Sequence, residues 1–187
     1  MKKLMFAMAL VLIGGAAFAA SCAIPWFADS DVTAVGYPVS KDTFVALVYL
    51  KSNADVPLVC TIAYYNPDGD FLGPFAPNNT FSIAPQSALA FRPTANDPTP
   101  AFGGVAGGQE AGQGLGVPNR PRSVGGAPIP GTTVVDTRPN GSITIGWEIP
   151  AGYDAEKGAK LIQGAVVGQA RSGSAIVSYG YLMPPGL

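Results

Sequence analysis

The sequence contains no histidine, and only 12% of its 187 residues are charged. Histidine is the commonest general base and the commonest metal ligand, so its absence removes both from the chain. An enzyme would then need a carboxylate pair, a serine–lysine arrangement or an activated cysteine. The acidic residues are scattered over predicted turns, and neither Asp29, Glu148 nor Asp154 lies within a recognisable motif. The sequence therefore predicts a protein that is not an enzyme, with no catalytic residue, no bound metal and no cofactor.

An excess of basic charge is also missing. The formal net charge is −1, so the chain has no positive field to attract phosphate groups. Nucleic acid is therefore not expected as a partner. A low charge combined with 48% hydrophobic residues is more typical of an exported or assembling protein than of a cytosolic enzyme.

A hydrophobic run with the length and flanks of a transmembrane anchor is absent, and we expect no transmembrane span. The apolar stretch Leu4–Ile13 follows Lys2 and Lys3 and precedes Ala17-Phe18-Ala19, a small-x-small cleavage pattern. These features predict a signal peptide over residues 1–19 with cleavage after Ala19. The short leader, beginning Met1-Lys2-Lys3, resembles the signal peptides of bacterial proteins. We expect an exported protein that is periplasmic, on the cell surface or extracellular.

Only two cysteines are present, Cys22 and Cys60. An exported chain with two cysteines is normally oxidised, so a Cys22–Cys60 disulfide is the first expectation. The alternative is a lipid anchor on Cys22, because Ala19-Ala20-Ser21-Cys22 partly resembles a bacterial lipoprotein box. That box usually has a larger aliphatic residue where Ala19 stands.

Alternating apolar residues predict short β-strands along most of the mature chain. Thr43–Tyr65 is the clearest stretch, with two strands joined by the polar loop Ser52–Pro57. The expected inward residues of the later strands are Phe81, Ile83, Leu89, Phe91, Ile143, Ile145, Trp147 and Ile149. A hairpin is predicted from Lys160 to Met183, and a short helical turn over Asp154–Ala159. No long amphipathic helix is present, so we predict an all-β fold, an antiparallel sandwich of seven to eight strands.

The segments TIAYYNPDG and FSIAPQSALAF, within Thr43–Pro93, resemble the Ig-like or fibronectin-like β-sandwich modules of exported bacterial proteins. The resemblance implies an Ig-like fold and an exported setting. It implies no activity, because such modules serve many unrelated functions.

Residues 94–140 differ sharply from the rest of the chain. They are rich in glycine and proline and have neither a strand nor a helix period. Such a stretch buries too little apolar surface to offset its ordering entropy. We therefore predict a single domain over residues 20–187, interrupted at 94–140 by a flexible excursion.

Two functions remain after these exclusions. The first is a non-catalytic structural or interaction module of the cell envelope or exterior, which self-associates or docks onto an envelope protein through exposed strand edges. The alternative is a carbohydrate-binding module that stacks sugars on surface aromatic rings. Its candidate ligand residues are Trp26, Tyr37 and Tyr153.

Overall fold

The computed structural model describes residues 19–29, 43–94, 100–101, 105–106 and 116–183. The predicted signal peptide, apart from Ala19, lies outside these residues, as does Tyr37. Within the described residues, 51% of the chain is strand and 3% is helix, which confirms the predicted all-β class.

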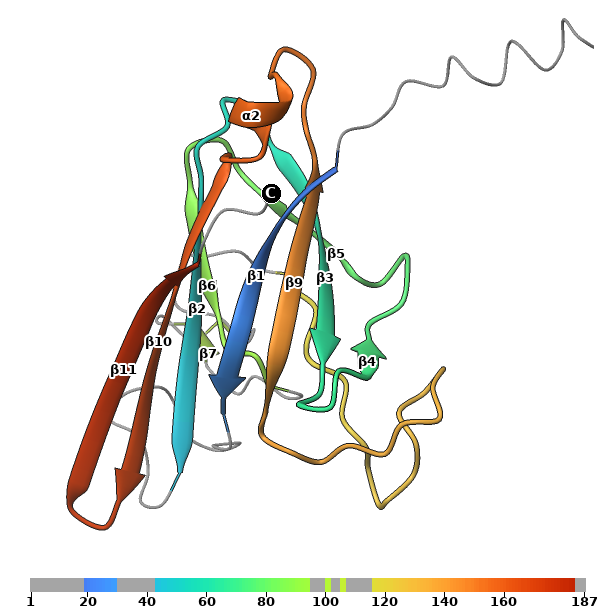
Figure 1. The fold of residues 1–187 in the computed structure, drawn as a ribbon, viewed down its shortest axis with the longest axis vertical. Helices are drawn as coiled ribbons and strands as arrows, with labels where there is room; N and C mark the ends of the chain where they lie inside the picture. The colour runs from blue at the N-terminus through green and yellow to red at the C-terminus, as the bar shows by residue number, and fades with distance from the viewer. Residues whose placement is uncertain (1–18, 30–42, 95–99, 102–104, 107–115, 184–187) are drawn as a thin grey trace, which may run out of the picture.

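Two antiparallel sheets form a sandwich (Figure 1). The five-stranded sheet has the order β1 (Ala19–Ala28), β9 (Asn140–Glu148), β3 (Leu58–Tyr65), β4 (Phe71–Gly73), and β5 (Thr80–Ile83) also pairs with β3. The four-stranded sheet has the order β11 (Ala175–Met183), β10 (Ile162–Ser172), β2 (Phe44–Ser52), β6 (Ala88–Phe91). A separate two-stranded ladder joins β7 (Pro100–Ala101) and β8 (Val105–Ala106). The two main sheets thus exceed the predicted strand number by at least one.

The strands β2 and β3 follow one another in the chain but belong to different sheets. β2 is an inner strand of its sheet, and its apolar side chains from Val45 to Val48 are buried on both faces, as predicted. In β3 the predicted inward residues Leu58, Cys60, Ile62 and Tyr64 are all buried. The loop between them therefore carries the chain from one sheet to the other.

The core lies between the two sheets and contains the residues predicted to face inward. Trp147 is buried, and its indole Nε1 donates a hydrogen bond of 3.0 Å to the carbonyl oxygen of Gly158. Gly158 ends the short helix α2 (Ala155–Gly158), whose N-cap is the side chain of Asp154. This hydrogen bond connects the predicted helical turn to the core. It also gives the N–H group of the buried indole a partner.

Residues 116–139, the second part of the predicted excursion, contain no strand but are attached to the sandwich. Ile129 is buried in the core, and the hydroxyl of Tyr64 donates to the carbonyl oxygen of Pro118 at 2.9 Å. The backbone N–H of Ser123 donates to the carbonyl oxygen of Asp136 at 3.0 Å. This attachment was not predicted, and the flexibility of residues 94–140 as a whole stays a prediction.

Candidate interaction surface

β11 is an edge strand of the four-stranded sheet, and its side chains are mostly exposed. It pairs on one side with β10 over its full length, from Ser172↔Ala175 to Gly164↔Met183. No strand of the described chain pairs with its other side. An edge strand presents a row of unpaired backbone N–H and C=O groups that can template another strand.

The hairpin turn between β10 and β11 determines which residues carry those free groups. The turn has two residues, and Gly173 at its first position has a φ of +59°. This is the position at which a type II′ hairpin turn needs glycine. Because a hydrogen-bonded pair closes a two-residue hairpin, Ala175 and every second residue after it bond to β10. The backbone groups of Ile176, Ser178, Gly180 and Leu182 therefore face outward.

The other edge strands of the sandwich have features that disfavour pairing with a further strand. β4, β5 and β6 have only three or four residues each. β1 is long, but it contains Pro25, and its register with β9 shifts between Ile24 and Phe27. Short strands, edge prolines and bulges all discourage pairing with another chain. β11 has nine residues, no proline and no charged side chain, so it is the least protected edge among the described strands.

Aromatic side chains of β11 connect its inner face to β1. The rings of Trp26 and Tyr179 have centroids 5.5 Å apart at an interplanar angle of 54°. The hydroxyl of Tyr181 donates to the carbonyl oxygen of Trp26, and burial raises the pKa of this tyrosine. A Cβ on Gly168 would lie 2.0 Å from the Tyr179 ring, so a larger residue there would force the ring to move. β1 and β11 therefore lie on the same side of the sandwich, and the tyrosines fix the position of β11.

The outer face of the hairpin presents apolar side chains to solvent. Leu182 is 82% exposed and Ile176 is 49% exposed, and Val167 on β10 is also exposed. Val167 lies diagonally across from Leu182, whereas Ile176 lies near the other end of the strand, so exposed apolar side chains occur along most of the length of β11. The sequence signal for this surface was the charge-free, proline-free run AIVSYGYLM, but the sequence alone did not show that it forms an edge.

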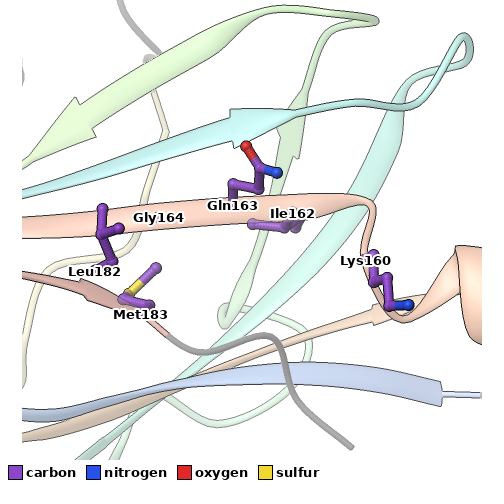
Figure 2. Close-up of a pocket in the computed structure, with 6 residues that line it drawn as sticks. All are labelled: Lys160, Ile162, Gln163, Gly164, Leu182 and Met183. Atoms are coloured by element: carbon purple, nitrogen blue, oxygen red, sulfur yellow. The ribbon is translucent and has the colours of Figure 1, made fainter.

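A hollow of about 360 Å³ lies where β10 begins and β11 ends (Figure 2). Lys160, Ile162, Gln163, Gly164, Leu182 and Met183 line it. A Cβ on Gly164 would lie 1.6 Å from Met183 Cε, so this glycine makes room for the methionine. The lining is mainly apolar with one lysine at the rim, and it groups no nucleophile with a base.

The candidate sugar-stacking residues are not brought together. Trp26 is 45% exposed, but it lies on β1 and its described neighbour Tyr179 is tilted against it. Tyr153 lies beside α2 and packs on the core, and its hydroxyl accepts a hydrogen bond of 3.0 Å from the N–H of Asp55. Among the described rings, Trp26 and Tyr153 form no common stacking platform.

The predicted Cys22–Cys60 disulfide is wrong. Both cysteines are free and buried. β9 lies between β1 and β3, and Cys22 pairs with Ile145 of β9 whereas Cys60 pairs with Trp147. The two cysteines are therefore separated by at least two strand spacings, or about 9–10 Å. A disulfide needs Cα atoms within about 7 Å.

Burial raises the pKa of each thiol to about 12, which makes both unreactive at neutral pH. The lipid-anchor alternative would require Cys22 to leave the core.

Asp29 and Arg92 form a buried ion pair at one end of the sandwich. Arg92 Nε donates to Asp29 Oδ2 at 2.9 Å, and both side chains are fully buried. The backbone N–H of Ala46 donates to the same carboxylate at 3.1 Å. Asp29 follows β1 in one sheet, whereas Arg92 and Ala46 belong to strands or strand ends of the other. The pair therefore joins the two sheets, and Asp29 has a structural partner.

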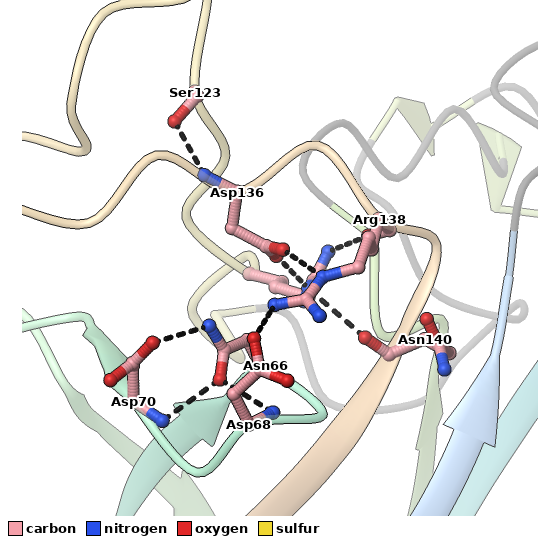
Figure 3. Close-up of polar contacts among 8 residues, drawn as sticks. Asn66, Asp68, Asp70, Ser123, Asp136, Arg138 and Asn140 are labelled. Carbon is pink, nitrogen blue, oxygen red and sulfur yellow. Dashed lines mark hydrogen bonds and ion pairs between the residues drawn. The ribbon is translucent and has the colours of Figure 1, made fainter.

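A second polar network attaches residues 116–139 to the turn after β3 (Figure 3). Buried Asp136 receives hydrogen bonds from Arg120 at 2.6 Å and from Arg138 at 2.7 Å. Arg138 also donates to Asp68 at 2.8 Å, and this bond lowers the pKa of that exposed carboxyl. Asn66 holds the turn by accepting from the N–H groups of Asp68 and Asp70. Each carboxylate here already has a partner, as expected of a structural joint.

The comparisons with known proteins assign no relative. The chain matches no family model, no curated protein and no solved structure. The Ig-like resemblance of the sequence consequently stays a prediction. Within the part of the chain that the structure describes, no helix has the length and apolar character needed to cross a membrane.

Proposed function

We propose that this protein is a non-catalytic, exported structural or interaction module that binds a protein strand along the free edge of β11. The observation that carries the proposal is a nine-residue edge strand with no charge, no proline and exposed apolar side chains. Adding a strand to an open sheet edge is an established mode of protein recognition, in which backbone hydrogen bonds supply affinity. The predicted leader supports an envelope or extracellular setting.

The buried carboxylates and thiols of the described chain support a structural role over a catalytic one. The buried carboxylates of Asp29 and Asp136 are neutralised by arginines, and both thiols are protonated at neutral pH. Carbohydrate binding is the alternative function. It is supported less well, because stacking on a sugar needs rings in a common plane, and Trp26 and Tyr179 are tilted by 54°.

Site-specific photo-crosslinking in the producing cells tests the proposal. A photoreactive residue is placed at Ser178, which lies on the β11 edge, and in a second variant at Val124, an exposed loop residue. We expect a discrete adduct from position 178 and none from position 124. Equal adducts from both positions, or none from position 178, would contradict the proposal.

A further inference from the structure

We infer that the strand bound by β11 is β11 of a second copy of this chain, paired antiparallel about a two-fold axis through Tyr179. This inference rests on the function proposed above. It names the partner and the register of that same edge.

The outward backbone groups allow this register. In an antiparallel pair centred on Tyr179, Ile176 lies opposite Leu182 of the second copy, and Ser178 lies opposite Gly180. All four residues have their N–H and C=O groups facing outward, so each of these pairs can form both of its backbone hydrogen bonds. A centre at Ser178 or Gly180 would leave one end of the strand unpaired. The centre at Tyr179 therefore uses the whole edge.

The exposed side chains also fit this register. The pair of Ile176 and Leu182 places two exposed apolar side chains on the outer face directly against each other, once on each side of the axis. On the inner face, exposed Val177 lies opposite half-buried Tyr181. Cross-strand contacts between aromatic and β-branched residues stabilise sheets. Exposed Ile176 and Leu182 thus become each other's partners, and exposed Val177 gains a tyrosine ring as its partner.

The charge of the strand favours a second copy over a charged partner. β11 carries no ionisable group other than its tyrosines, so bringing two copies together opposes no like charges. A two-fold contact is self-complementary and closes after two copies, which prevents growth into a fibre. The dimer would join two four-stranded sheets into one sheet of eight strands, within the usual size of open sheets.

The charge-pair test uses two double variants that remove the same apolar side chains. In I176K/L182K, each lysine faces a lysine of the second copy. In I176K/L182E, each lysine faces a glutamate. Positions 176 and 182 are far apart within one strand, so the two introduced charges face each other only when two copies pair in this register. Val124→Lys, at a residue as exposed as Leu182 (both 82%), is the control.

Light scattering of the mature protein at increasing concentration gives the result. We expect the unchanged protein, Val124→Lys and I176K/L182E to reach twice the mass of one chain, and I176K/L182K to remain monomeric. A monomeric unchanged protein, or a dimeric I176K/L182K, would overturn the inference, as would two monomeric double variants. If Ser178 crosslinks to a different protein while the unchanged chain is monomeric, the proposed function stands and the second copy as partner is wrong.

Discussion

At the scale of single residues, the buried charges lie where segments from different parts of the chain meet. Asp29 connects the end of β1 to Arg92 and to the backbone of Ala46, across the two sheets. Arg120 and Asp136 connect residues 116–139 to one another and to the start of β9. Removing one partner of such a pair leaves an uncompensated charge in the interior, which costs more than the pair contributes.

Replacing Arg92 by methionine should lower the free energy of unfolding by about 3–5 kcal/mol, because the Asp29 carboxylate stays buried without its partner. Urea denaturation measures the change. The matched control is Arg122→Met, at an exposed arginine, which should change the free energy by less than about 0.5 kcal/mol. Similar effects of the two substitutions would contradict the structural role of Asp29–Arg92.

The two cysteines should be free thiols that are inert in the folded protein. Alkylation at pH 8 should label neither Cys22 nor Cys60 in the native state and both after denaturation, as measured by intact mass. A native mass lower by two hydrogens would show a disulfide and contradict the structure.

The same thiols predict how stability depends on pH. Burial raises their pKa from 9.0 to about 12, so the unfolded chain loses these protons at a lower pH than the folded chain. Their contribution to stability is therefore complete below pH 9 and is lost as the pH rises toward 12. The double variant Cys22→Ala/Cys60→Ala should lose less stability than the unchanged protein over this window, as measured by urea denaturation. Equal losses would count against burial of the thiols.

At the scale of elements, the β10–β11 hairpin combines a glycine-dependent geometry with an open edge. Gly168 lies under the Tyr179 ring, and Gly164 lies under Met183. Large side chains of β11 thus pack across glycines of β10. This arrangement holds the inner face of β11 against the sandwich while its outer edge stays open.

Gly168→Ala should destabilise the protein by about 1–3 kcal/mol, because its Cβ would lie 2.0 Å from the Tyr179 ring and force the ring to move. Gly180→Ala on the facing strand is the control, since the nearest atom to its Cβ is 3.4 Å away. Urea denaturation of both variants gives the comparison. An equal effect at the two positions would show that the ring does not lie on Gly168.

The sequence predicts the strands well because the inward residues alternate along each one. Phe81, Ile83, Leu89 and Phe91 face the core as their spacing predicts, and the hairpin and the turn at Asp154 are also present. The pairing order could not be predicted in the same way. The position of β9 between β1 and β3 depends on contacts between distant segments, and this position separates the two cysteines.

The candidate site was less predictable for the same reason. The run AIVSYGYLM is recognisable as a strand, but an edge strand and an inner strand have similar composition. The ion pairs of Asp29 with Arg92 and of Arg120 with Asp136 join residues 63 and 16 positions apart, and no local period marks them. They become visible only when the sheets are assembled.

At the scale of the whole molecule, β11 is the one long edge strand of the described chain that neither a proline nor a register shift interrupts. β1 is interrupted by Pro25 and a register shift, and the remaining edge strands are short. β11 combines full length, neutrality and exposed apolar side chains. The central claim is that the outward backbone groups of this strand are the binding site.

Residue-resolved amide hydrogen exchange in β11 tests this claim most directly. In dilute protein, the outward amides of Ile176, Ser178, Gly180 and Leu182 should exchange fast, while those of Val177, Tyr179 and Tyr181 exchange slowly, because these bond to β10. In concentrated protein, the four outward amides should become protected and the other three should change little. The claim is contradicted if the outward amides are slow in dilute protein, or if they stay fast at concentrations where the protein has associated.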